Sequence, residues 1–210
     1  GIDDLIAACR HHLQHHANIE LPPFVMITLE QSNAAEQRLV AEHWWLRHQS
    51  LIHGMQKFQA RRDARTGNKI RIGYLSADFH AHATAWLLAR VIELHNRDRF
   101  EIFALSCGPD DDSSTRTRLQ QAFDHFEDIA PLSDVAAAQR IQQLNIDILL
   151  EVKGHTLNTR LGIVAQRAAP LQINYLAYPA TIGNDCIDYI ITDHYLNNSE
   201  QQVYFNETFA

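Results

Sequence analysis

The sequence predicts an α/β protein with a doubly wound parallel sheet, preceded by a helical region. From Lys69 onward, short apolar runs alternate with helical patterns, which is typical of a parallel sheet covered by helices on both faces. Before Arg61 only helical patterns recur, and the polar stretch RRDARTGN at 61–68 separates the two regions. We therefore expect a helical linker region over residues 1–66 and a Rossmann-like lobe over 67–210.

The composition excludes several classes of function. The 210 residues carry 18 Lys and Arg against 25 Asp and Glu, for a net charge of -7. An acidic chain is a poor non-specific ligand for nucleic acids or membranes, so neither is expected as a partner. The three cysteines are far apart and form neither a metal spacing nor a disulfide framework. Together with the lack of a signal-peptide pattern or of an apolar run near ~20 residues, they lead us to expect a cytoplasmic protein.

The first region is predicted to hold two helices. One covers residues 3–17, and the sequence LPPF breaks it. The second begins after Asn33, where Asn33 and Glu36 fit a capping box, and apolar residues recur at helical spacing to Phe58. Trp44 and Trp45 on this helix are expected to be packing residues.

Four histidines of the first helix form the i,i+4 pairs His11/His15 and His12/His16. Such pairs could bind a metal on one helix face, but no HExxH pattern accompanies them. We favour an exposed polar face, and no metal site is predicted.

The second region is expected to contain six strands in the order 3-2-1-4-5-6. Strand-like runs cover Ile70–Leu75, Phe100–Leu105, His125–Ile129, Ile146–Val152, Leu171–Leu176 and Tyr189–Ile191. Helical patterns cover Thr84–Leu94, Thr115–Phe123, Val135–Leu144 and Arg160–Arg167.

In such a sheet, ligands bind beyond the carboxyl ends of the strands, where the winding reverses. For this order, three loops meet there, namely 76–83, 153–158 and 177–184. Their polar and small residues are Asp78, His80 and His82, then Lys153, Gly154 and His155, then Tyr178, Pro179, Thr181 and Gly183. We therefore expect a site where these loops converge.

His82 and Asp78 are the candidates for chemistry in the first loop. His82 lies just before a predicted helix, whose N-terminal N–H groups favour negative charge and therefore a neutral imidazole. Asp78 could orient a histidine or accept a proton from a substrate. The alternative is that Asp78 and His80 only cap the turn and the helix.

Three well-known site patterns are absent from the sequence. It contains neither GxGxxG after the first strand nor GxxxxGK[ST], which argues against dinucleotide binding of the Rossmann type and against P-loop nucleotide binding. It has no GxSxG elbow, so a standard α/β-hydrolase is not expected.

The segments KIRIGYLSADFHAHAT, RAAPLQINYLAYPATIG and DYIITD resemble the N-terminal half of the catalytic region of SPINDLY-like O-GlcNAc transferases. The resemblance covers about Lys69 to the end, with a weaker likeness of the region before Arg61 to the linker that follows the tetratricopeptide repeats. It implies a GT-B glycosyltransferase with two Rossmann-like lobes. Such enzymes transfer N-acetylglucosamine from UDP-GlcNAc to Ser or Thr hydroxyls of proteins, with inversion and without a metal or other cofactor.

The resemblance also assigns residues. The SDFxxHPTS pattern places the active-site histidine on His82, the motif aspartate on Asp78 and the threonine on Thr84. The NGYT loop matches 154–156, so that a sugar-pocket tyrosine becomes His155.

The LGYPGT turn supplies the other predicted pocket residues, which are Leu176, Ala177, Tyr178, Pro179 and Thr181. The chain departs from the family patterns at Ala81, Ala83, Trp86, Ala177 and Ala180. These departures put the range of sugar donors and acceptors in doubt more than the fold.

In this family a second lobe supplies the uracil and diphosphate contacts and a key lysine. That lobe is not in these 210 residues, so we expect the chain alone not to turn over UDP-GlcNAc. Two other hypotheses stay open: a lobe kept as a non-catalytic interaction module, and a GT-B transferase that uses another donor sugar or acceptor.

Overall fold

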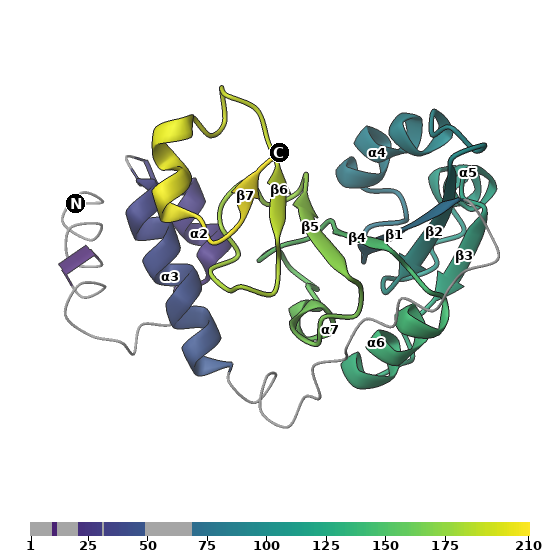
Figure 1. Cartoon of the computed structure of the whole chain (residues 1–210), viewed down its shortest axis with the longest axis horizontal. Helices are drawn as coiled ribbons and strands as arrows, with labels where there is room; N and C mark the ends of the chain where they lie inside the picture. Colours follow the sequence, from purple (N-terminus) through teal and green to yellow (C-terminus); the bar gives the residue numbers. More distant parts are fainter. Residues whose placement is uncertain (1–9, 12–20, 31, 49–68) are drawn as a thin grey trace.

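A parallel sheet forms the centre of the computed structural model, which describes residues 10–11, 21–30, 32–48 and 69–210 (Figure 1). Its strands follow the order β3-β2-β1-β4-β5-β6-β7, and every neighbouring pair is parallel. The strands are β1 Ile70–Ser76, β2 Phe100–Ser106, β3 His125–Asp128, β4 Ile148–Glu151, β5 Leu171–Tyr175, β6 Tyr189–Ile191 and β7 Thr208–Phe209. The predicted doubly wound order is confirmed, with one further strand at the edge.

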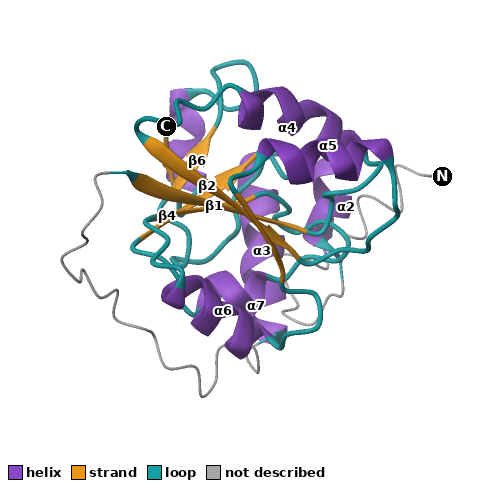
Figure 2. Cartoon of the chain, turned by 90° about the vertical axis from the view of Figure 1, so that its right-hand side faces the viewer, coloured by secondary structure: helices purple, strands orange, loops and turns teal. Residues whose placement is uncertain are grey.

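The helices cover both faces of this sheet. They are α4 Ala83–Glu93, α5 Ser114–Ala122, α6 Asp134–Gln143 and α7 Leu161–Ala165, with a 3₁₀ helix η2 at Ser199–Tyr204. Figure 2 shows α4 and α5 on one side of the strands and α6 and α7 on the other. The winding therefore reverses between β1 and β4, where the sequence places it.

Each face has its own apolar core because successive residues of a strand point to opposite sides. On the α4 side, Tyr74 of β1 packs in one cluster with Leu88 and Ile92 of α4. On the other side, the neighbouring Leu75 belongs to the cluster that includes Ile141 of α6. The two clusters hold both layers of helices against the strands.

Two helices precede the sheet, α2 Pro23–Thr28 and α3 Ala34–Arg47. The capping box is confirmed, because the Asn33 side chain accepts the Glu36 N–H and the Glu36 side chain accepts the Asn33 N–H. The helix α2 was not predicted, since the two prolines were interpreted only as a break. Pro23 occupies the first turn of α2, where a helix needs no N–H donor.

The helix α3 packs on the loop that follows β5. Trp45 is 4% exposed, and its Nε1–H donates to the Ile182 carbonyl at 2.8 Å. A Cβ on Gly183 would lie 2.6 Å from the Cβ of Ala41, so this close contact requires glycine. Trp45 is therefore a packing residue, as predicted.

Several predictions fall outside the described residues. They are the helix over 3–17 apart from residues 10–11, the histidine pairs apart from His11, the second helix beyond residue 48, and the boundary near residue 66. Within the described ranges, none of the helices is both long and apolar enough to cross a membrane.

Candidate active site

The turn between β1 and α4 places His82 at the start of the helix. His82 has extended backbone angles and is the N-cap of α4, and its Nδ1 accepts the Thr84 N–H at 3.2 Å. Thr84 is buried, whereas 43% of the His82 side chain is exposed. His82 therefore caps the helix with one edge of its ring and still reaches solvent.

Asp78 and Lys153 form a buried ion pair next to His82. The Nζ of Lys153 lies 2.7 Å from both carboxylate oxygens of Asp78, and the two side chains are 6–7% exposed. Each residue comes two positions after the end of its strand, and β1 and β4 are neighbours in the sheet. This pair confirms that the first two predicted loops converge.

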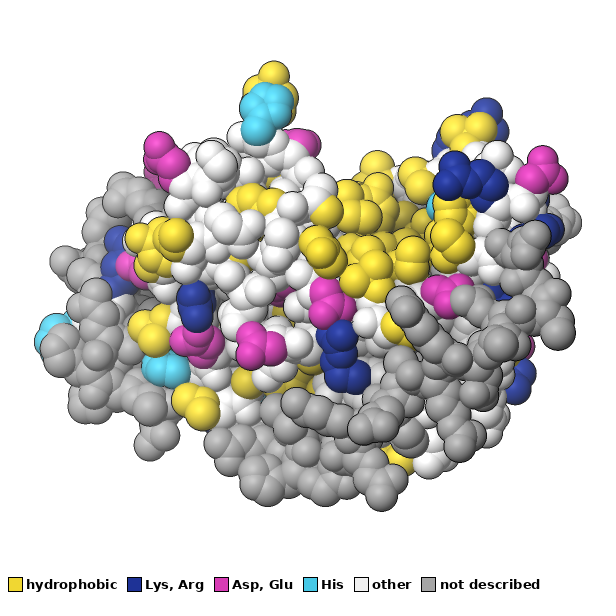
Figure 3. All heavy atoms as spheres, in the orientation of Figure 1, with side chains coloured by type: hydrophobic (Ala, Val, Ile, Leu, Met, Phe, Trp, Pro, Cys, Tyr) yellow, Lys and Arg dark blue, Asp and Glu magenta, His cyan; other side chains and the backbone are white. Residues whose placement is uncertain are grey.

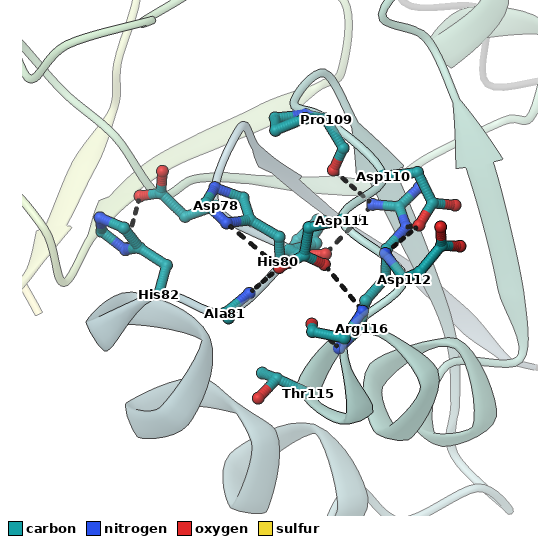
Figure 4. Close-up of polar contacts among 12 residues, drawn as sticks. Asp78, His80, Ala81, His82, Pro109, Asp110, Asp111, Asp112, Thr115 and Arg116 are labelled. Atoms are coloured by element: carbon teal, nitrogen blue, oxygen red, sulfur yellow. Dashed lines mark hydrogen bonds and ion pairs between the residues drawn. The ribbon is translucent and has the colours of Figure 1, made fainter.

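The same carboxylate also faces the histidine. Asp78 Oδ2 lies 3.5 Å from His82 Nδ1, and Figure 4 shows the two side chains turned toward each other. Asp78 thus lies next to His82, and its role as an orienting group stays a prediction. Its shortest contacts, however, are with Lys153, a residue that the resemblance did not assign to the site.

A second buried carboxylate shapes the loop after β4. Glu151 is fully buried and accepts the backbone N–H groups of Lys153, at 3.1 Å, and Gly154. Burial raises the pKa of Glu151 to about 7, although these N–H groups and the Lys153 charge oppose the rise. Gly154 has a φ of 54°, and a side chain on it would overlap Tyr178.

His155 is a core histidine in this structure. It is 6% exposed, and its Nε2 lies 2.8 Å from the Ile182 carbonyl, to which it donates. Its ring contacts Trp44 and Tyr178 edge to face, with centroids 4.9 Å and 5.3 Å apart. Burial lowers the pKa of His155 to about 4, so the imidazole is neutral at physiological pH.

The loop after β5 is fixed by residues near the end of the chain. Thr181 Oγ1 and the Ile182 N–H both donate to the buried carboxylate of Glu207, at 2.7 and 2.6 Å. Asn197 Nδ2 donates to the Pro179 carbonyl at 3.0 Å. The hydroxyl of Thr181 is thus used to hold the loop.

The predicted pocket residues of this loop differ in exposure. Tyr178 and Thr181 are buried, whereas Leu176, Ala177 and Pro179 are partly exposed. Leu176 has a φ of 94°, which a bulky side chain adopts only under strain, and such strain clusters at functional sites. The backbone and the three partly exposed residues are the parts of the loop that a ligand could reach.

The turn that carries His82 is tied to the loop after β2. Asp111 accepts the Ala81 N–H at 2.8 Å, and this bond is the largest cause that lowers the pKa of Asp111 to about 2 (Figure 4). The buried Arg116 donates to the carbonyls of Phe79 and Pro109. His80 Nδ1 lies 3.9 Å from Asp111 Oδ2. Sequence analysis predicted only a polar loop that leads into a helix here, and it missed the roles of Arg116 and Asp111.

The cluster of His82, Asp78 and Lys153 is separate from the pocket near the start of β6. That pocket has a volume of about 350 Å³ and is lined by Ala165, Arg167, Gly183, Asn184, Asp185, Cys186 and Asn206. It shares no lining residue with the cluster. In the part of the chain that the structure describes, no three His, Cys, Asp or Glu side chains come together in a way that could hold a metal ion.

Comparisons with known proteins identify relatives of this architecture. The model of glycosyl transferase family 41 matches residues 25–210. Arabidopsis thaliana SEC is 36% identical over 129 residues, which are 61% of this chain and 13% of that protein. A UDP-N-acetylglucosamine–peptide N-acetylglucosaminyltransferase of Caenorhabditis elegans is 38% identical over 128 residues, or 60% of this chain and 11% of that protein.

A solved structure has the same fold. A mutant O-GlcNAc transferase from Thermobaculum terrenum superposes with a TM-score of 0.80 at 25% identity, over 90% of this chain and 36% of that one. The chain thus spans about a third of the solved relative and about an eighth of the curated ones.

Proposed function

The chain belongs to glycosyl transferase family 41, and we propose that it forms the acceptor-side lobe of an inverting protein O-GlcNAc transferase. The proposed reaction moves N-acetylglucosamine from UDP-GlcNAc to a Ser or Thr hydroxyl of a protein. The hydroxyl oxygen bonds to the anomeric carbon, the bond from that carbon to the diphosphate breaks, and UDP leaves with the hydroxyl proton on its diphosphate.

The observation that carries this proposal is the cluster of His82, Asp78 and Lys153 at the switch point of the sheet. Open α/β sheets bind ligands there, and glycosyl transfer requires polar groups placed around the reacting oxygens. His82 presents a partly exposed ring edge on the turn, and Asp78 lies behind it. We assign the reacting centre to these two residues.

The proposed sugar pocket lies beside this cluster. Its wall consists of Thr84 on α4, His155 after β4, and Leu176, Ala177, Tyr178, Pro179 and Thr181 after β5. Because His155, Tyr178 and Thr181 are buried, we propose that they support the wall from behind. Leu176, Ala177 and Pro179 would then contact the ligand.

The departing diphosphate needs positive charge that this cluster does not offer, since Lys153 is already paired with Asp78. We propose that a second lobe supplies these contacts in the whole enzyme, without a metal. The free Cys107 and Cys186 fit a reducing compartment, and we propose a cytoplasmic location.

The test measures transfer of N-acetylglucosamine to protein acceptors by mass spectrometry. The 210-residue chain is expected to be inactive, and the full-length product of its reading frame is expected to be active. In the full-length protein, His82→Ala should abolish most of the transfer, while the matched control His80→Ala should retain it. Transfer by the 210 residues alone, or an unchanged rate in His82→Ala, would contradict these assignments.

A further inference from the structure

His82 Nδ1 has two neighbours that require opposite protonation states of this nitrogen. The Thr84 N–H points at Nδ1 from 3.2 Å, which requires a lone pair on that nitrogen. Asp78 Oδ2 lies 3.5 Å away, and a hydrogen bond to this oxygen would require a proton on Nδ1. A neutral imidazole satisfies only one of them.

Asp78 already has another partner, Lys153. Its ammonium lies 2.7 Å from both oxygens of Asp78, so the buried carboxylate has a full partner without the histidine. Nδ1 is then free to accept from Thr84, and the ring proton must be on Nε2. Without Lys153, the carboxylate would be buried and uncompensated, and a proton on His82 Nδ1 would be the nearest replacement.

The other charged groups around His82 do not reverse this balance. The ring of His80 lies 5.6 Å from that of His82, and its own acidic neighbour is Asp111 at 3.9 Å. The ring also caps the N-terminal end of α4, where the Thr84 N–H points at Nδ1.

We propose that Lys153 is a positioning residue that holds His82 with its ring proton on Nε2, so that His82 meets its ligand as a hydrogen-bond donor. The ligand atom that His82 contacts is then an oxygen that accepts a hydrogen bond. In UDP-GlcNAc this atom would be a sugar hydroxyl or a phosphate oxygen, and this part rests on the proposed function. In this state Nε2 cannot receive the proton of the acceptor hydroxyl, and this proton passes to the departing diphosphate.

NMR of the 210-residue protein tests the position of the proton without any turnover. Long-range ¹⁵N–¹H spectra of labelled histidine distinguish the two tautomers, and the His82 signals are those lost in His82→Gln. We expect a proton on Nε2 and none on Nδ1 at pH 7.5. A proton on Nδ1 in the wild-type protein would overturn the proposal.

Substitutions then test the role of Lys153. Lys153→Met should move the proton to Nδ1, whereas the exposed control Lys69→Met should leave the spectrum unchanged. An unchanged spectrum in Lys153→Met would overturn the role of Lys153. The double variant Asp78→Asn/Lys153→Met removes both buried charges and should keep the proton on Nε2. It keeps the test valid even if the single variant Lys153→Met does not fold. A switch to Nδ1 in the double variant would show that the carboxylate is not the cause and would also overturn the proposal.

Transfer assays on the full-length protein test the donor role. A glutamine side chain can donate a hydrogen bond and a glutamate cannot, so His82→Gln should retain roughly tenfold more transfer than His82→Glu. The pair His80→Gln and His80→Glu controls for the added charge. A higher rate in His82→Glu would overturn the donor role. Loss of transfer in every protein, wild type included, would contradict the proposed function and leave the NMR result standing.

Discussion

Lys153 Nζ contacts both carboxylate oxygens of Asp78 at 2.7 Å, and this buried pair joins the loops that follow β1 and β4. At the switch point of the sheet, each of these two buried charges therefore has the other as its partner in place of water.

Loss of one partner of this pair should destabilise the fold strongly. Lys153→Met leaves the buried Asp78 carboxylate uncompensated, and we expect a loss of about 3 to 5 kcal/mol in the free energy of unfolding. Urea unfolding measures it. The control Arg90→Met breaks the exposed pair with Glu93 and should cost much less, because water screens exposed charges. Equal effects in the two variants would contradict the assigned burial of the Lys153–Asp78 pair.

Glu151 should make the folded protein less stable as the pH rises. Its pKa is about 7 in the folded state against 4.5 for the ordinary group, so the folded state binds more protons between these values. Stability therefore falls as the pH rises from 4.5 to 7 and is then constant. The unfolding free energy of the wild type minus that of Glu151→Gln, measured from pH 4 to 8, should show this fall. A flat difference would contradict the prediction.

His155 should have the opposite effect. Its folded pKa of about 4 lies below the ordinary value of 6.5, so the unfolded chain binds the proton first as the pH falls. Stability is complete above pH 6.5 and decreases by roughly 3 kcal/mol down to pH 4.

In the matched variant His155→Phe this decrease should vanish. The Ile182 carbonyl keeps a donor there, the Nε1–H of Trp45. Because the effects of His155 and Glu151 oppose each other between pH 4.5 and 6.5, each is visible only as a difference between wild type and variant. Identical pH curves for the wild type and His155→Phe would show that His155 does not titrate as expected.

Gly154 should not tolerate a side chain. It has a φ of 54°, and a Cβ there would overlap Tyr178, so Gly154→Ala adds a steric clash to backbone strain. The exposed Asn158 has a φ of 61°, and Asn158→Ala introduces only the strain, about 1 kcal/mol. Thermal unfolding should show a larger loss for Gly154→Ala. Similar losses would mean that the Tyr178 ring can move aside.

Local patterns in the sequence were sufficient to predict most of the fold. The apolar runs of β1 and β2 match the structure within one residue, because buried strands of a parallel sheet need continuous apolar sequence. The two-residue β7 has no pattern of its own and forms only by pairing with β6. The α2 helix was not predicted because proline occurs both where helices end and where they begin.

The location of the candidate site in the sheet could be predicted from the sequence, but the contacts between its side chains could not. The sheet order was enough to bring the loops with Asp78 and Lys153 together. Whether the flexible Lys153 side chain turns inward depends on tertiary burial, which its sequence neighbours do not encode. The roles of His155 and Thr181 in the sugar pocket came from the resemblance and stay predictions. Their burial could not be predicted from local patterns, because it depends on Trp44 and Glu207, which are distant in the sequence.

Ile182 shows how such distant contacts meet at a single residue. Its carbonyl accepts from Trp45 and His155, and its N–H donates to Glu207. A ribosome synthesises these partners from near the beginning to near the end of the 210 residues. During translation, the loop after β5 can therefore reach its final shape only once Glu207 has left the exit tunnel, however early the rest of the sheet has folded.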